Sequence, residues 1–198
     1  MDDELSRFLS SQRAFAERVH AVREDQWSAP TPCREWSVAD LVSHLIEENR
    51  WAGPLVHGLD LQSAGKVVEG ARKLPVHGGV GANLAEEWDE AAVEAGDAFS
   101  ADGALDRTVN LSRGQTPVRQ YIAEMIADHV IHAWDLGQAI GYAEPLPAEL
   151  VDVVYEVAKS MGDMSDSGMF DKPVAVPDDA PTIDRLVALC GRDPHTAR

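Results

Sequence analysis

The longest uninterrupted helical pattern in the chain lies between Pro117 and Gly141, and it limits the possible folds more than any other feature. Apolar side chains recur there every three or four residues, and Gly141 is suited to ending a helix. Thr116 is expected to cap this helix, with Pro117 in its first position. At 1.5 Å per residue the helix is about 36 Å long, so the fold must supply apolar partners along that length.

Several other segments can supply these partners. Helical periodicity predicts further helices over residues 3–24, 38–58, 81–100, 147–161 and 181–193. Residues 60–80 are rich in glycine and are expected to form a partly ordered connection, and 102–115 a loop with a short extended piece at Arg107–Leu111. Strands and helices do not alternate, which disfavours a Rossmann-type sheet. We therefore predict an all-α four-helix bundle over residues 1–162, followed by a proline-containing tail, 163–198, whose short helix packs on the same domain.

Composition narrows the expected partners. The chain has 34 acidic and 17 basic residues, for a formal net charge of -17. Such a surface repels phosphate backbones and anionic membranes, so neither nucleic acid nor a membrane is an expected partner. The N-terminus lacks the basic and then apolar pattern of a signal peptide, and no stretch has the length and apolarity of a membrane span. The two cysteines suggest no disulfide framework, and a cytoplasmic location is expected.

Polar residues interrupt the apolar pattern of MIADHVIHAWDLGQAIG, residues 125–141. Asp128 and His132 are four residues apart, so their side chains are neighbours on one helix face, among apolar residues. His129 lies about a quarter turn away and is a less certain member of this group. Asp135 falls on the flank of the pair. A face built in this way is either hydrated or in contact with something charged.

A similar feature occurs in the helix predicted over residues 38–58. His44 shares a face with leucine and tryptophan side chains and should point inward, and Glu48 follows it by one turn. His44, Asp128 and His132 form a three-ligand set with an open position, as catalytic divalent ions use. Zinc is favoured by ligand type, and nickel or iron fits the same groups. A buried His–Asp–His hydrogen-bond network without metal explains the spacing equally well.

Three stretches of the chain resemble the DinB/YfiT-like metal-binding superfamily. They are PTPCREWSVADLVSHLIEENRW at 30–51, ADHVIHAWDLGQAIG at 127–141 and KPVAVPDDAPTIDRLVALCGRDP at 172–194. The sequence is most similar to the actinobacterial branch related to mycothiol-dependent maleylpyruvate isomerase. This resemblance implies a DinB-like four-helix bundle with metal ligands at His44, Asp128 and His132. Asp128 stands where the isomerase relatives tend to carry glutamate, and His129 has no ligand role in the family pattern.

The resemblance also implies a function. Members of this branch use mycothiol, so the expected activity is that of a mycothiol-dependent transferase or isomerase in which a metal activates the thiol for attack on a small electrophile. The separate C-terminal domain of the isomerase is not expected in this chain. A metal-dependent hydrolase with Glu48 or Asp135 as general base, or a metal-binding protein without catalysis, are the alternatives. The expected partners are a small-molecule electrophile and a low-molecular-weight thiol, and the extended tail is compatible with a homodimer.

Other reactive residues fit these hypotheses less well. Cys33 is expected to be a small loop residue rather than a nucleophile, because it lies ahead of the helix start. Arg50 or Arg113 could hold a carboxylate, but both are expected to be solvated surface residues. Packing roles are expected for Trp51 and Trp134. No role is assigned to the remaining histidines, His20, His57, His77 and His195.

Overall fold

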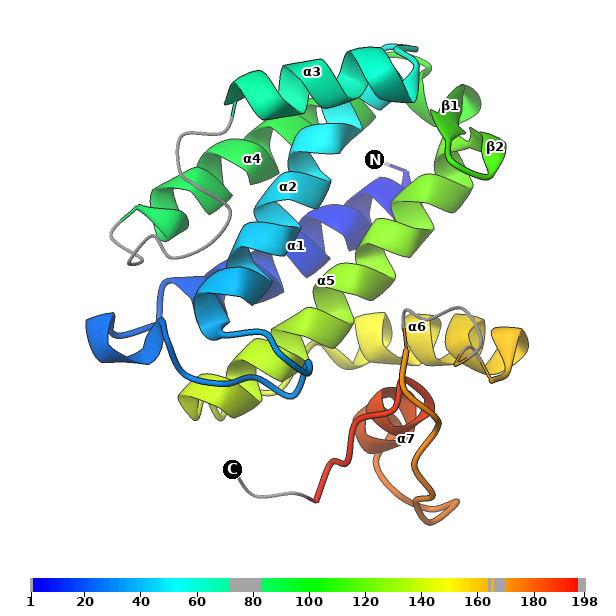
Figure 1. Ribbon diagram of the computed structural model, residues 1–198. Helices are drawn as coiled ribbons and strands as arrows, with labels where there is room; N and C mark the ends of the chain where they lie inside the picture. Colours follow the sequence, from blue (N-terminus) through cyan, green and yellow to red (C-terminus); the bar gives the residue numbers. More distant parts are fainter. Residues whose placement is uncertain (1, 72–82, 164, 166–169, 196–198) are drawn as a thin grey trace.

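Four long helices form the body of the molecule. The computed structural model describes residues 2–71, 83–163, 165 and 170–195. The bundle consists of α1 (Asp3–Val19), α2 (Val38–Val56), α4 (Leu84–Ser100) and α5 (Val118–Ile140). α1 packs mainly against α5 and α2 mainly against α4, and further contacts join α1 to α4 and α2 to α5 (Figure 1). The prediction of an all-α four-helix bundle is confirmed.

Aromatic side chains fill much of the bundle interior. Phe8, Phe15, Trp88 and Phe99 are each at most 1% exposed. Phe8 meets Phe99 edge-on at 4.9 Å between ring centroids, and Phe15 packs on Trp88 at 4.6 Å. Each such ring removes a large apolar area from water, and this burial is the main term that favours folding. The packed rings give α2 and α5 a rigid support.

Several helix boundaries differ from the predictions, and α1 and α5 show the physical reasons. α1 ends at Val19 instead of residue 24, because the chain turns through a short 3₁₀ helix, η1 (Glu24–Gln26), which brings Trp27 into the core at 8% exposure. The long helix α5 begins at Val118. Thr116 is therefore not its cap, and Pro117 occupies the N-cap position. Gly141 does end α5, with φ at +72° and its N–H donating to Gly137 O.

The glycine-rich connection contains a helix that the sequence did not predict. α3 (Leu61–Ala71) packs against α2 through Ala64 and Val68, which are both at most 1% exposed. A Cβ atom at Gly65 would lie 3.2 Å from the Trp51 ring. Gly65 thus permits close packing of α3 on α2 and is not a turn signal. Residues 72–82, which include His77 and the first two residues of the helix predicted over 81–100, lie outside the described residues.

The segment between α4 and α5 forms a small hairpin. After the 3₁₀ helix η2 (Ala104–Asp106), β1 (Thr108–Leu111) pairs antiparallel with β2 (Gly114–Pro117). β1 corresponds to the extended piece expected there, but its partner strand was not predicted. Val109 and Thr116 face each other in this register, and both are at most 3% exposed. The hairpin therefore covers the end of the bundle where α5 begins.

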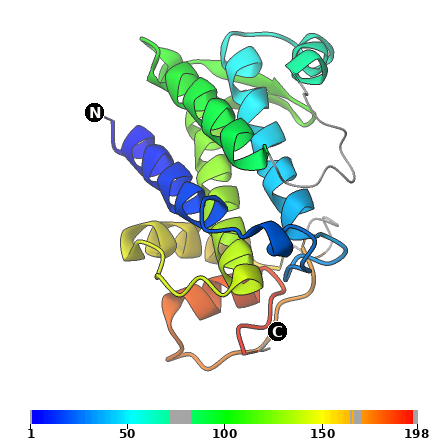
Figure 2. The same cartoon turned by 90° about the vertical axis from the view of Figure 1, so that its left-hand side faces the viewer.

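The C-terminal part of the chain covers the opposite end of the bundle. α6 (Ala148–Met161) and α7 (Thr182–Leu189) pack on each other beside the end of α5, as Figures 1 and 2 both show. The segment before α7 is joined to the end of that helix by a hydrogen bond from Val174 N to Ala188 O of 2.9 Å. Within the described ranges, no helix combines the length and apolarity needed to cross a membrane.

Candidate metal centre

The structure brings His44, Asp128 and His132 together where α2 faces α5. His44 Nε2 lies 3.3 Å from Asp128 Oδ2, and His132 Nε2 lies 3.3 Å from Asp128 Oδ1. The candidate ligand atoms of the three residues all lie within 4.8 Å of one another. Both imidazoles therefore point the same nitrogen, Nε2, toward one carboxylate.

These separations match the needs of a small divalent ion. Nitrogen and oxygen atoms about 2.0 Å from a tetrahedral zinc ion lie about 3.3 Å from each other. Two imidazoles and a carboxylate also suit zinc, nickel or ferrous iron. The His44 and Asp128 side chains are 30% and 33% exposed, whereas that of His132 is 8% exposed. The cluster is consequently open on one side, where a further ligand could enter.

The charges in the cluster favour a cation. Partial burial alone would raise the pKa of Asp128, but the charges and hydrogen bonds of His132 and His44 outweigh it and hold that pKa well below its usual range. Burial alone would lower the pKa of His132, but Asp128 and Asp135 raise it to about 9. Asp128 is therefore ionised, and the positive charge of protonated His132 occupies the role that a divalent ion could take. Metal binding would release that proton.

Asp135 holds the outer nitrogen of His132. The two groups, His132 Nδ1 and Asp135 Oδ2, are 3.0 Å apart. Arg192 in turn donates to both oxygens of Asp135, from Nε at 3.2 Å and from Nη2 at 2.9 Å. Asp135 is 0% exposed and Arg192 9% exposed. This chain of contacts keeps a proton on Nδ1, which leaves Nε2 as the ligand nitrogen, as in many carboxylate–histidine–metal arrangements.

Arg192 was not found by the sequence analysis, which placed it inside the helix predicted over residues 181–193 and gave it no role; in the structure that helix, α7, ends at Leu189. Its position depends on Gly191, which has φ at +80°. A Cβ atom at Gly191 would approach Asp171 to 2.5 Å. The glycine thus lets the tail pass Asp171 and turn back toward α5. The signal in the sequence that could have pointed to Arg192 was the Cys-Gly-Arg stretch near the end of the family-like segment 172–194.

Trp36 and Glu48 border the cluster. The Trp36 ring lies 4.8 Å from that of His44 and 5.7 Å from that of His132, between ring centroids, so it forms one wall. Glu48 is half-buried on α2 one turn after His44. Burial and the negative charge of Asp128 raise the pKa of Glu48 to about 6. Glu48 can therefore hold or release a proton near neutral pH.

Cys33 lies on the other side of His132. Its candidate ligand atom groups with those of His132 and Asp135 within 4.8 Å. This second group is a weaker metal site, because Asp135 is already bound to Arg192 and because burial raises the pKa of the Cys33 thiol. Arg192 Nη2 lies 3.8 Å from Cys33 Sγ. Cys33 is thus a partly buried loop residue that borders His132.

His129 belongs to the core and not to the cluster. It is 0% exposed, and its Nε2 accepts a hydrogen bond from Asn49 Nδ2 at 2.9 Å. Its Nδ1 lies 3.0 Å from Ser11 Oγ, which itself donates to Phe8 O. The ring is therefore the neutral tautomer that carries its proton on Nδ1. Burial lowers the pKa of His129 to about 4.

This buried histidine gives the metal-free protein a specific pH dependence. The folded state resists protonation of His129 until about pH 4, whereas the unfolded state takes up that proton near its ordinary value of 6.5. Neutral His129 therefore contributes to the free energy of unfolding in full above pH 6.5. This contribution, about 3 kcal/mol at most, is lost as the pH falls toward 4. Urea unfolding in the presence of a chelator should show this loss of stability between pH 6.5 and pH 4. The loss should be smaller in His129→Gln. An identical pH profile for the variant would contradict the assignment.

Arg50 and Arg113 have different environments. Arg50 is 9% exposed and donates from Nη2 to Glu87 Oε2 at 2.9 Å, so its prediction as a solvated surface residue is wrong. Arg113 is exposed, as expected, and pairs with Glu124. Trp51 packs on Gly65, as described above, and Trp134 lines a cavity considered below. The histidines His20, His57 and His195 are exposed and lie outside the cluster.

Comparisons with known proteins point to one family. The model of the mycothiol maleylpyruvate isomerase N-terminal domain matches residues 8–137, which include His44, Asp128 and His132. Uncharacterized proteins from two strains of Mycobacterium tuberculosis are 32% identical over 198 residues, with 96% of this chain and 98% of each relative covered. Crystal structures of mycothiol-dependent maleylpyruvate isomerase and of a histidine-to-alanine mutant of it are 14% and 12% identical. Each superposes with a TM-score of 0.59 over 84% of this chain and 71% of that chain, which shows a shared fold.

Proposed function

The chain belongs to the mycothiol maleylpyruvate isomerase N-terminal domain family, and we propose that it is a mycothiol-dependent enzyme of the transferase or isomerase type. In this proposal a divalent metal ion is bound by His44, Asp128 and His132, and zinc is the first choice on ligand chemistry. The substrate is a small electrophile. Membership of this family points to isomerase- or transferase-like activity.

One observation carries the proposal. Three side chains from two helices come together on a face that is partly open: each histidine Nε2 lies 3.3 Å from one oxygen of the Asp128 carboxylate, and all candidate ligand atoms lie within 4.8 Å of one another. A bound divalent ion would lower the pKa of a thiol that ligates it, so that the thiol is a thiolate at neutral pH. Asp135 and Arg192 orient His132, and Trp36 shields the histidines from water on one side. Glu48 can take up a proton beside the site.

Activity should therefore depend on both metal and mycothiol. Zinc-loaded protein is mixed with mycothiol and either maleylpyruvate or monobromobimane, an electrophile that reacts with thiols to give a fluorescent product. We expect a rate above the uncatalysed reaction for at least one of them, which is lost in His44→Ala. A rate that is unchanged when mycothiol is omitted would contradict thiol dependence. No acceleration with either compound would leave metal binding without the proposed catalysis.

Glu48 supports a second candidate function. Its pKa of about 6 suits a general base that activates water at a metal, as in metal-dependent hydrolases. That function predicts thiol-independent, metal-dependent hydrolysis of an activated ester such as p-nitrophenyl acetate, with a large loss in Glu48→Gln. Under the mycothiol proposal, ester hydrolysis stays at background. Stoichiometric metal without turnover in either assay would indicate a metal-binding protein without catalysis.

Arg192 should matter for metal affinity although it is not itself a proposed ligand. Arg192→Met removes both hydrogen bonds to the buried Asp135 and frees the His132 ring to reorient. Losses of this kind typically weaken metal binding by about 10–100-fold. Competition with a chromophoric chelator measures the affinity. The matched control is Arg34→Met, which removes an exposed pair with Asp171 and should leave affinity unchanged. Equal affinities for both variants would exclude the role assigned to Arg192.

A further inference from the structure

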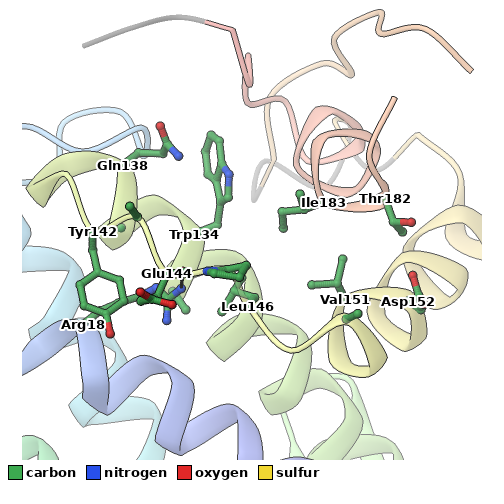
Figure 3. A pocket seen from close by; sticks show the side chains of 15 residues that line it. Arg18, Trp134, Gln138, Tyr142, Glu144, Leu146, Val151, Asp152, Thr182 and Ile183 are labelled. Carbon is green, nitrogen blue, oxygen red and sulfur yellow. Dashed lines mark hydrogen bonds between the residues drawn. The ribbon is translucent and has the colours of Figure 1, made fainter. Parts of the chain in front are cut away.

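A cavity lies on the side of α5 away from the metal ligands. It has a volume of about 370 Å³ and lies between α5, the 142–148 segment, α6 and the start of α7. Trp134 and Gly137 line it from α5, and helix geometry places them about 140–160° around the axis from His132. Figure 3 shows Arg18 and Tyr142 at one end and Ile183 at the other. Much of its wall lies beyond residue 137, where the family match ends.

Arg18 is the unusual feature of this cavity. It is 3% exposed, and it donates from Nη1 to Ala14 O and from Nη2 to Glu144 O, each at 2.7 Å. Its Nε has no hydrogen-bond partner. No carboxylate among the described residues forms an ion pair with Arg18, and the Tyr142 ring lies against its guanidinium carbon at 4.9 Å. A buried cation without a counter-ion is costly, and burial lowers the pKa of Arg18.

We propose that this cavity binds a small organic monocarboxylate, with the carboxylate against Arg18 and an apolar body toward α7. A guanidinium has five N–H donors, and the hydrogen bonds that Arg18 makes to Ala14 and Glu144 use two of them. Nε is closed to solvent, so the N–H groups that remain on Nη1 and Nη2 are the ones that can meet the two oxygens of a carboxylate. The volume falls within the range of ordinary small-molecule sites.

The other lining residues determine which anions fit. Trp134, Leu146, Val151 and Ile183 give the cavity flat aromatic and aliphatic walls, which suit a planar apolar body. Glu144 and Asp152 also line the cavity and are exposed. Their charges, with the formal net charge of -17, disfavour phosphates and other multiply charged anions. A ligand with a single carboxylate on an apolar group suits both the apolar walls and the negative charge around the cavity.

Benzoate and benzamide form a matched pair of probes, because they have nearly the same shape and differ in charge. Calorimetric titration should use chelator-treated protein, so that binding at the metal centre cannot contribute and the outcome is independent of the proposed function. We expect saturable benzoate binding, with benzamide weaker by about tenfold or more. Equal binding of the two probes, or no saturable benzoate binding up to about 10 mM, would overturn the proposal.

Two variants locate the binding. Arg18→Met keeps the apolar stem and should weaken benzoate by about tenfold or more, whereas the exposed control Arg119→Met should bind like the parent protein. Ile183→Trp leaves Arg18 in place and fills the far end of the cavity, so it should also lose benzoate. If Arg18→Met does not fold, Ile183→Trp decides the question. Parental benzoate affinity in either folded variant would overturn the assignment.

Discussion

Replacing His132 with alanine is expected to abolish stoichiometric metal binding while the protein stays helical. The variant removes one of three proposed ligands, and the effect on affinity should exceed the 100-fold or so seen when an outer contact is lost. The fold should persist because the packed aromatic core of the bundle does not involve His132, and Asp135 keeps its two hydrogen bonds from Arg192. Elemental analysis after zinc loading and circular dichroism measure the two quantities.

The control for this experiment is His20→Ala. His20 is an exposed histidine that pairs with Asp89 far from the cluster, so its removal should leave zinc content unchanged. His44→Ala should behave like His132→Ala. Full zinc occupancy in either of these two variants would show that the ligand assignment is wrong, whereas a loss of helicity together with the metal would show that the metal supports the fold.

Replacing Glu87 with glutamine is expected to be the most destabilising of the substitutions considered. The Arg50 and Glu87 side chains are 8% and 6% exposed, and the Arg50 Nη2–Glu87 Oε2 distance is 2.9 Å. Removing one charge leaves Arg50 as a buried cation without its partner, which costs about 3–5 kcal/mol. Urea unfolding at pH 7 measures the change in the free energy of unfolding. The control is Glu124→Gln, which breaks an exposed pair with Arg113 and should cost less than about 1 kcal/mol.

A double mutant separates the charge effect from packing. Arg50→Met combined with Glu87→Leu replaces the whole pair with apolar groups, and such replacements are often neutral or stabilising. The double mutant should therefore be more stable than Glu87→Gln alone. If it is as unstable as the single variant, the side-chain volumes and not the charges maintain the α2–α4 contact. A loss below about 1 kcal/mol in Glu87→Gln would contradict the burial of this pair.

The four long helices and the Asp128–His132 pair could be predicted because each depends on local spacing. Residues four apart on α5 must be neighbours, so Asp128 and His132 were certain to share a face once the helix formed. The direction of His44 followed from the apolar residues beside it. That the two helices meet at this point came from the family resemblance, since spacing alone gives no contact between segments that are more than 80 residues apart in the sequence.

Other features depend on tertiary contacts that a single sequence does not carry. Gly65 was taken as a loop signal, but it serves the packing of α3 on Trp51. Arg50 was expected in water, but Glu87 from α4 neutralises it in the interior. Arg192 reaches Asp135 only because the tail turns back at Gly191. In each case the partner lies on a different element, and composition and periodicity contain no information about it.

Binding of a metal and of mycothiol at His44, Asp128 and His132 can be followed on protein loaded with Co(II), which takes the same ligands as zinc and absorbs visible light. We expect about one cobalt ion per chain, bound by two histidines and one carboxylate. We also expect a new sulfur-to-cobalt charge-transfer band when mycothiol is added, which is absent in His132→Ala. Bound cobalt without any new band at saturating mycothiol would contradict thiol binding at the metal. Protein that binds no cobalt would reduce the His44–Asp128–His132 cluster to a hydrogen-bond network.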